Sequence, residues 1–183
     1  MMKLLIVVDY QNDFVDGSLG FEEAERLDSI IASKIAQYRR NGDAVAFTLD
    51  THYDNYNETQ EGRKLPVPHC IKGTRGHELY GKTAKQRLMC DMVFEKNTFP
   101  SLEMAEYLKQ KEYESVELAG LVSNICVISN AVMVKAALPE AEIIVDASCT
   151  AGADKALHEK CLDVMEGMQI TVLGRNKQRK VDK

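Results

Sequence analysis

The sequence predicts an α/β fold: a single-domain, three-layer, doubly wound sheet of six mainly parallel strands in the order 3-2-1-4-5-6. Two observations carry this prediction. Strand-like and helix-like segments alternate along the chain, which is typical of a parallel sheet with helices on both faces. The 183 residues show no internal repeat and no break in composition, so we expect one domain over residues 1–183.

Each element is predicted from its own pattern. The first strand is a continuous apolar run, as in strands buried on both faces. Between residues 22 and 40, apolar residues recur at helical spacing until Asn41 and Gly42 end the pattern. Ser123 or Asn124 is the expected N-cap of a later helix. In chain order, the predicted elements are a strand at 3–8, a loop at 10–20, a helix at 22–40, a strand at 44–49, a loop at 51–81, a strand at 92–94, a helix at 100–111, a strand at 115–118, a helix at 125–138, a strand at 141–145, a helix at 154–166 and a strand at 169–173.

Composition argues against several classes of function. The net charge of -5 gives no support to nucleic-acid or anionic-membrane binding. No apolar run approaches the ~20 residues of a membrane span, and residues 1–8 lack the length and cleavage site of a signal peptide. The cysteines are odd in number and contain no CxxC pair, which argues against a disulfide framework and favours a reduced, cytoplasmic setting. The basic tail, residues 175–183, is expected to be a solvated end.

Polar side chains that could act in catalysis or bind a metal follow four of the predicted strands. Asp9 follows the first strand, Asp50 and His52 the second, Lys96 the third and Cys126 the fourth. The carboxyl ends of parallel strands share one edge of the sheet, and ligands bind where the strand order reverses. Because the first and fourth strands are neighbours at that point, we expect Asp9 and Cys126 to face each other across a crevice.

Each of these residues has a chemical and a structural interpretation. Cys126 falls in the first turn of a predicted helix, where backbone N–H groups and the helix dipole lower a thiol pKa. The structural alternative is that Cys126 is a small buried apolar residue, as many cysteines are. Asp9 can take the thiol proton, or it can be a loop carboxylate. Lys96 can hold Asp9 ionised and Cys126 as thiolate, or it can be a surface lysine. His77 and His158 are expected on exposed helix faces.

A second group of residues has the composition of a metal site. Asp50 and His52 lie on one side of an extended segment because side chains alternate along it, and His69 can reach them from the loop 51–81. A carboxylate with two imidazoles suits Zn²⁺, Fe²⁺ or Mn²⁺. Glu58 and Glu61 are further oxygen donors within reach. The alternative is a set of unrelated loop residues, but a loop of this length with its prolines and histidines favours function.

Together these residues resemble the isochorismatase-like cysteine hydrolases and, within them, the nicotinamidase (pyrazinamidase) branch. The similarity extends over roughly residues 4–173, in element order. The matching segments are 4–14, 50–52, 64–70 with Gly73 and Thr74, Lys96, and 120–127. The Asp9, Lys96 and Cys126 triad marks the superfamily, and the metal residues mark the nicotinamidase branch.

The resemblance implies a role for each residue of the triad. Cys126 attacks an amide carbonyl, Asp9 shuttles the proton and Lys96 is the electrostatic partner. The backbone N–H groups of Val122 and Cys126 form the oxyanion hole, beside a cis peptide between Leu121 and Val122.

The resemblance also implies a metal-anchored ring pocket. Asp50, His52 and His69 hold a divalent metal, foremost Zn²⁺ with Fe²⁺ or Mn²⁺ as alternatives, which binds the pyridine nitrogen of nicotinamide. Glu61 is the expected additional ligand, directly or through water. Phe14 and Phe99 form the aromatic walls. Many nicotinamidases have tryptophan where this chain has Thr51, and the chain contains no tryptophan, so part of the usual pocket is missing or replaced.

The expected activity is therefore metal-dependent hydrolysis of nicotinamide to nicotinate and ammonia through a thioester, with a place in NAD salvage. Two alternatives stay open: the same triad acting on another small amide or ureido compound, and a non-catalytic binding scaffold. The expected partner is a small-molecule amide, without nucleic acid or membrane, and the chain is expected to form a homo-oligomer. In this interpretation the loop 51–81 holds metal and substrate.

Overall fold

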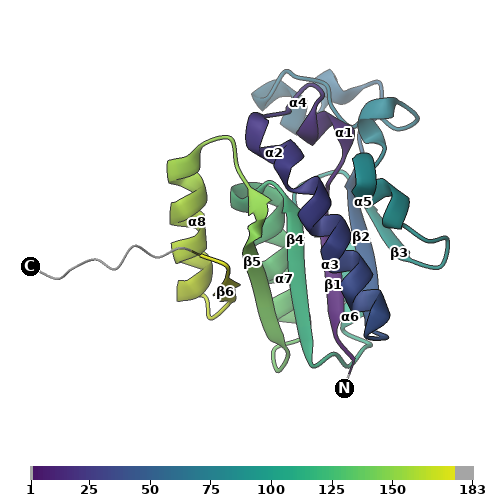
Figure 1. Cartoon of the computed structure of the whole chain (residues 1–183). Helices are drawn as coiled ribbons and strands as arrows, with labels where there is room; N and C mark the ends of the chain where they lie inside the picture. The colour runs from purple at the N-terminus through teal and green to yellow at the C-terminus, as the bar shows by residue number, and fades with distance from the viewer. Residues whose placement is uncertain (1, 176–183) are drawn as a thin grey trace, which may run out of the picture.

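The doubly wound sheet is present as the sequence predicts. The computed structural model describes residues 2–175, so most of the basic tail at 175–183 lies outside the described residues. The sheet has the strand order β3-β2-β1-β4-β5-β6, and every neighbouring pair is parallel (Figure 1). Its strands are β1 (Leu4–Val8), β2 (Ala44–Asp50), β3 (Met92–Lys96), β4 (Ser115–Leu121), β5 (Glu142–Ala151) and β6 (Thr171–Leu173).

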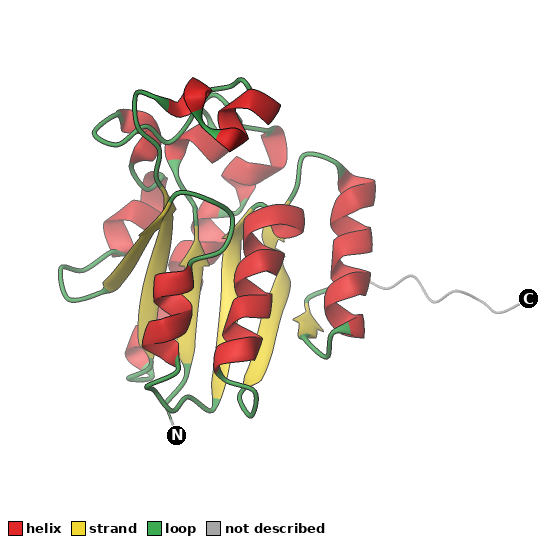
Figure 2. Cartoon of the chain, turned by 180° about the vertical axis from the view of Figure 1, so that it is seen from behind, coloured by secondary structure: helices red, strands yellow, loops and turns green. Residues whose placement is uncertain are grey.

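Helices cover both faces of the sheet, as the views from front and back show (Figures 1 and 2). Helices α3 and α7 pack against opposite faces, α3 on β1 and β2 and α7 on β5. None of the helices within residues 2–175 is long and apolar enough to cross a membrane. The helices are α1 (Asn12–Val15), α2 (Glu22–Arg26), α3 (Asp28–Arg40), η1 (Tyr56–Glu58), α4 (Gln60–Lys64), η2 (Arg75–His77), α5 (Gly81–Gln86), α6 (Leu102–Leu108), η3 (Ser123–Val127), α7 (Ile128–Ala137) and α8 (Lys155–Gly167).

The central strand β1 supplies side chains to two hydrophobic clusters, one on each face. Leu4, Ile6 and Val8 join the cluster under α6, α7 and α8, whereas Leu5 and Val7 join the cluster under α3. All five side chains are buried. Side chains alternate across a strand, so a continuous apolar run is what a strand covered on both faces requires.

Several predicted boundaries are wrong. The predicted helix at 22–40 is two helices, because Leu27 ends α2 and serves as the N-cap of α3. The predicted loop at 10–20 contains α1, and the loop at 51–81 contains η1, α4 and η2. These short helices depend on local bonds, such as the Thr59 hydroxyl that accepts from Gly62 N–H, and apolar periodicity does not report such bonds.

Strands β2, β3, β4 and β5 all end later than predicted, and the extensions of β3 and β5 bear on the site. β3 continues to Lys96, so this lysine ends the strand rather than following it. β5 continues through the mostly polar residues 146–150 to Ala151, because a register shift lets it pair with Gly120 and Leu121 of β4. Gly120 has φ +117°, and a Cβ there would lie 2.0 Å from the Val8 carbonyl oxygen, so only glycine allows β4 to lie this close to β1.

The carboxyl ends of the strands form one edge of the sheet, and the segment 51–81 lies over this edge (Figure 1). β1 lies between β2 and β4 at the point where the strand order reverses. Ligands bind at such switch points in open α/β sheets. The fold therefore directs attention to the residues that end β1, β2, β3 and β4.

Candidate active site and metal centre

Asp9, Lys96 and Cys126 meet at the switch point of the sheet. Lys96 Nζ lies 2.6 Å from Asp9 Oδ2 and 3.8 Å from Cys126 Sγ. The Thr48 hydroxyl donates to Asp9 Oδ1 at 2.6 Å. All four residues are buried. A thiol, a carboxylate and an ammonium are therefore in mutual reach, away from bulk water.

Each member of this group is held by the end of a different strand. Asp9 follows β1 in a left-handed conformation, φ +46°, which is uncommon outside glycine and is found at functional sites. Lys96 is the last residue of β3. Cys126 lies in η3, a π-helical turn that follows the cis peptide between Leu121 and Val122 implied by the family resemblance.

The local structure of η3 corrects the predicted helix start. Neither Ser123 nor Asn124 is the N-cap, because Val122 occupies that position without a side-chain cap. The Val122 carbonyl accepts hydrogen bonds from Ile125 and Val127 N–H. Val122 and Cys126 therefore lie on one tight turn at the carboxyl end of β4.

The protonation of Cys126 differs from the prediction. Burial raises the pKa of Cys126 well above its ordinary value, and the Asp9 charge raises it further, although Lys96 opposes both. The direction is therefore opposite to the predicted lowering of this pKa, because the side chain is only 5% exposed and burial disfavours the thiolate. Burial also raises the pKa of Asp9, against the opposing charge of Lys96. Burial thus disfavours the charged forms of both Cys126 and Asp9, and the nearby Lys96 ammonium favours them.

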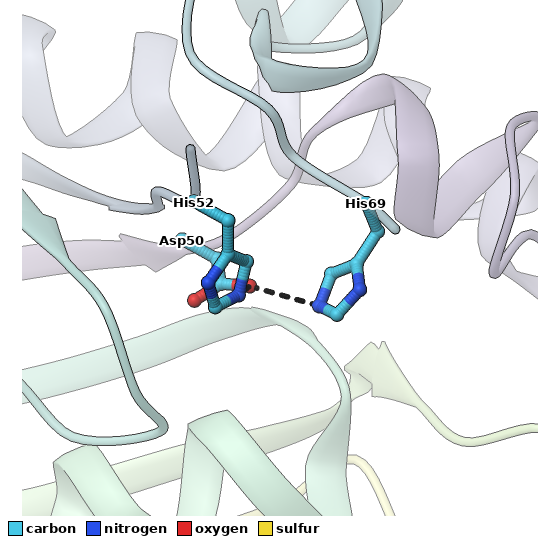
Figure 3. A group of neighbouring side chains, drawn as sticks. All are labelled: Asp50, His52 and His69. Atoms are coloured by element: carbon cyan, nitrogen blue, oxygen red, sulfur yellow. Dashed lines mark hydrogen bonds and ion pairs between the residues drawn. The ribbon is translucent and has the colours of Figure 1, made fainter. Parts of the chain in front are cut away.

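Asp50, His52 and His69 converge next to this group (Figure 3). Asp50 Oδ2 lies 3.0 Å from His52 Nε2 and 3.2 Å from His69 Nε2. The three candidate ligand atoms all lie within 4.8 Å of one another, and the three residues are buried. Asp50 and His52 come from the end of β2, and His69 comes from the loop that crosses the sheet edge. The structure thus brings together the three residues that the sequence marked as metal ligands.

The hydrogen bonds of these residues fit a bound cation. His69 Nδ1 donates to the Val67 carbonyl oxygen at 2.8 Å, which fixes the ring and leaves Nε2 pointing at the Asp50 carboxylate. Two acceptor atoms facing each other at this distance need a proton or a metal ion between them. Desolvation acts to lower the pKa of His69, but the bond to Asp50 and the bond to Val67 raise it overall. One carboxylate and two imidazoles suit Zn²⁺, Fe²⁺ or Mn²⁺.

Glu61 lies beside the two histidines. Its Oε1 is 3.8 Å from both His52 Nε2 and His69 Nε2, and burial with the nearby Asp50 charge raises its pKa. Glu58, the other glutamate considered in the sequence, is exposed in η1. Glu61 is therefore the glutamate that adjoins the three converging side chains.

Two residues that support the site escaped the sequence analysis. Tyr56 packs edge-on against both imidazoles, with ring centroids 4.8 Å from His52 and 5.1 Å from His69. Thr48 bonds Asp9, as described above. Thr48 could have been noticed as a polar residue within the apolar run that precedes Asp50 in β2, whereas Tyr56 carries no local sequence signal.

The two predicted aromatic walls have different surroundings. Phe14 is buried, and its ring lies edge-on to His69 with centroids 5.6 Å apart. Phe99 is 42% exposed, and its carbonyl oxygen accepts from the Asn130 side chain. An open pocket adjoins the metal residues, lined by Thr51, His52, Tyr53, Asn55, Thr59, Gln60, Glu61, Asn97 and Thr98.

The remaining histidines are not on exposed helix faces, contrary to prediction. Both are half-buried, and burial lowers the pKa of each. His77 Nε2 lies 2.9 Å from the Thr51 hydroxyl, and His158 Nδ1 lies 2.8 Å from the Ser123 hydroxyl. His77 therefore contacts Thr51 and His158 contacts Ser123, and both of these partners lie next to the site.

Known proteins share this fold and sequence pattern. The isochorismatase domain pattern matches residues 3–177. PncA of Bacillus subtilis (strain 168), an uncharacterized isochorismatase family protein, is 34% identical over 143 residues, covering 72% of this chain and 78% of that protein. The nicotinamidase/pyrazinamidase of Mycobacterium tuberculosis (strain ATCC 25618 / H37Rv) is 26% identical over 142 residues, covering 69% of this chain and 75% of that protein. A crystal structure of nicotinamidase/pyrazinamidase PncA from Bacillus subtilis has a TM-score of 0.84 at 28% identity, covering 94% of this chain and 100% of that chain.

Proposed function

The chain belongs to the isochorismatase family, and from this premise we propose that it is a nicotinamidase. In this proposal it is a cysteine amidohydrolase that converts nicotinamide and water to nicotinate and ammonia. Its single domain spans residues 1–183, and the segment 51–81 holds metal and substrate. Relatives named nicotinamidase/pyrazinamidase support this substrate class.

One observation carries the proposal: Lys96 adjoins both the nucleophile and the metal residues. Its Nζ lies 3.8 Å from Cys126 Sγ and 3.4 Å from Asp50 Oδ1. In this proposal a small flat substrate bound next to Lys96 contacts the thiol and the metal residues at once. Nicotinamide has this shape, with an amide on one side of a ring and a nitrogen ligand on the other.

The first half of the proposed reaction forms a thioester. Asp9 takes the proton of the Cys126 thiol, and Sγ attacks the amide carbonyl carbon. The backbone N–H groups of Val122 and Cys126 stabilise the negative oxygen of the tetrahedral intermediate. Asp9 then gives the proton to the leaving nitrogen, the C–N bond breaks and ammonia departs. Lys96 keeps Asp9 ionised at the start and lowers the pKa of the attacking thiol.

The second half hydrolyses the thioester. Asp9, deprotonated again, takes a proton from water, and the resulting hydroxide attacks the thioester carbonyl carbon. The C–S bond then breaks and Cys126 recovers its proton from Asp9. The product leaves as nicotinic acid and releases its carboxyl proton to solvent, which gives nicotinate. The raised pKa of Cys126 fits this cycle, because the thiol loses its proton only when the base removes it and regains it at the end.

Asp50, His52 and His69 are the proposed metal ligands, with Glu61 as an additional ligand, directly or through water. When bound, a divalent ion such as Zn²⁺, or Fe²⁺ or Mn²⁺, acts as a Lewis acid that anchors the pyridine nitrogen. Phe14 and Phe99 are the proposed walls of the ring pocket.

A screen for released ammonia, combined with metal analysis, tests the proposal. The purified protein is expected to hold a divalent metal and to hydrolyse nicotinamide, but not a linear ureido amide such as an N-carbamoyl amino acid. His52→Ala is expected to weaken both metal and nicotinamide binding. Turnover of the ureido compound without turnover of nicotinamide would show that the same triad acts on another substrate. Two observations favour this second candidate function: Phe99 is exposed, and the chain contains no tryptophan to complete the ring pocket.

A further inference from the structure

The segment that follows Asp9 contains three side chains that the proposed reaction does not use. Gln11, Asn12 and Asp13 cross beneath the segment 51–81, and each bonds to its backbone or to the end of β2. Gln11 and Asn12 are buried, and Asp13 is half-buried. Polar side chains at buried positions need partners, and the identity of these partners indicates what the segment does.

The side-chain amide of Gln11 forms hydrogen bonds with both the N–H and the carbonyl group of Asp50, one of the proposed metal ligands. Its Oε1 accepts from Asp50 N–H at 2.8 Å, and its Nε2 donates to the Asp50 carbonyl oxygen at 2.9 Å. The second N–H of the same amide donates to the His77 carbonyl oxygen at 2.8 Å. β1 ends at Val8, and beyond that end the Gln11 amide bonds both backbone groups of Asp50 on β2. All the donors of this fully buried amide are used.

Asp13 fixes the loop backbone next to His69. Its Oδ2 accepts from Cys70 N–H at 2.7 Å, directly after His69. Cys70 has φ +47°, and its carbonyl oxygen accepts from His52 N–H at 3.0 Å, so the bonded segment links both histidines. A Cβ on Gly76 would lie 2.0 Å from Asp13 Oδ2, so the loop backbone closes tightly around this carboxylate.

We propose that Gln11 and Asp13 are positioning residues of the metal centre, Gln11 by fixing the backbone of Asp50 and Asp13 by fixing the backbone at His69. The inference rests on the metal site of the proposed function and deepens it. One short segment then carries the proton shuttle Asp9 and also sets the spacing of the metal ligands. Partners that orient metal ligands typically change metal affinity 10–100-fold, roughly, when they are removed.

The affinity of the metal-free full chain for Zn²⁺, measured by competition with a chromophoric chelator, tests this inference without any assay of catalysis. Gln11→Glu keeps the acceptor for Asp50 N–H but loses both donors, so we expect the Kd for Zn²⁺ to rise about 10-fold or more. Gln11→Asn keeps the amide but is one methylene shorter, and we expect it to weaken Zn²⁺ binding as well.

Asn12→Asp is the matched control. It makes the same amide-to-carboxylate change one residue further on, where Asn12 Nδ2 donates to the Arg75 carbonyl oxygen at 2.7 Å rather than to a metal residue. We expect this variant to keep the wild-type Kd. Equal Kd values for Gln11→Glu, Gln11→Asn and Asn12→Asp in folded protein, as judged by circular dichroism, would overturn the role of Gln11.

Asp13 needs a separate control, because its charge alone attracts a cation. Asp13→Asn keeps an acceptor for Cys70 N–H without the charge, and we expect it to bind Zn²⁺ far better than Asp13→Ala. If both variants bind equally weakly, charge rather than positioning explains the effect, and the role of Asp13 is overturned. A wild-type chain that binds no Zn²⁺ would instead overturn the metal site of the proposed function, and the inference with it.

Discussion

Lys96 is the residue on which the two halves of the site depend. Its ammonium is buried between two carboxylates, 2.6 Å from Asp9 Oδ2 and 3.4 Å from Asp50 Oδ1. Burial acts to lower the pKa of Lys96, but Asp9, Cys126 and Asp50 together raise it above its ordinary value. The lysine therefore stays charged. Within residues 2–175, it is the only cationic side chain that forms an ion pair with Asp9.

Lys96→Met is expected to lower both stability and turnover. The substitution leaves Asp9 and Asp50 without their buried counter-charge, and breaking a buried pair in this way costs about 3 kcal/mol of unfolding free energy. Urea denaturation measures this loss. The double variant Asp9→Asn/Lys96→Met removes both charges of the pair, so it is expected to regain much of the stability and none of the activity. A Lys96→Met protein as stable as the wild type would contradict the account of the pair.

At the residue scale, the sequence predicted which side chains meet but not their ionisation. Asp9, Lys96 and Cys126 were found because each ends or follows a strand, and strand ends share one edge. The pKa of Cys126 was predicted in the wrong direction, since dipole arguments consider one helix, whereas burial depends on every element packed around the thiol. Tyr56 was not predicted, because its contact with His52 and His69 depends on the three-dimensional path of the loop and not on a local sequence pattern.

At the scale of elements, η3 and α7 together orient the nucleophile. Asn130 on α7 is fully buried and makes three bonds. Its Nδ2 donates to the Cys126 carbonyl oxygen at 2.8 Å and to the Phe99 carbonyl oxygen at 3.1 Å, and its Oδ1 accepts from Ser101 N–H at 3.0 Å. This side chain therefore joins the cysteine turn to the segment that carries Phe99.

Asn130→Asp is expected to reduce turnover, because the carboxylate keeps the acceptor and loses both donors. Displacement of a reacting group by about 1 Å can cost up to 10²-fold in rate, so we expect a kcat lower by about 10- to 100-fold. Ser101→Ala is the control: it removes the hydroxyl that caps Met104 N–H and costs about 1 kcal/mol in stability. If kcat falls equally in both variants, general destabilisation explains the loss and the orienting role of Asn130 is wrong.

The sequence identified the long regular elements better than the short ones. β1 and β2 were predicted within a residue at each end, because apolar runs bounded by polar residues report buried strands directly. The register shift that extends β5 to Ala151 was not predictable, since residues 146–150 are mostly polar and pair only because β4 offers Gly120 and Leu121. The segment 51–81 was expected to be functional, but its helices depend on contacts across the sheet edge.

At the scale of the whole molecule, α8 couples the last third of the chain to the nucleophile turn. His158 Nδ1 lies 2.8 Å from the Ser123 hydroxyl, and the Cys161 thiol donates to the Ser123 carbonyl oxygen at 3.2 Å. Burial lowers the pKa of His158, Arg175 lowers it further and Glu159 opposes them. The folded protein therefore favours neutral His158.

This lowered pKa makes stability depend on pH. As the pH falls through about 6.5, the unfolded chain binds a proton at residue 158 before the folded chain does. The free energy of unfolding of the wild type should therefore decrease from pH 7 toward pH 5 more steeply than that of His158→Gln, which has no titrating group there. Urea denaturation at several pH values measures both. Parallel pH profiles for the two proteins would show that His158 is not held neutral by the fold.

The overall topology was predictable from the alternation of elements, and the strand order proved to be 3-2-1-4-5-6 as predicted. What no local pattern contains is the contact of Lys96, at the end of β3, with Asp9 two strands away, across β2. That contact depends on the twist of the sheet and on the length of the lysine side chain. It is also the contact that joins the thiol, the acid and the metal residues into one site.

The most direct measurement is the release of nicotinate from nicotinamide by the zinc-loaded wild type and by Cys126→Ala, with bound zinc determined in the same samples. The wild type is predicted to release nicotinate and ammonia in equal amounts. Cys126→Ala is predicted to bind zinc as the wild type does and to release neither product above the uncatalysed background. Release of nicotinate by Cys126→Ala at the wild-type rate would contradict the assignment of Cys126 as nucleophile, on which the proposed function depends.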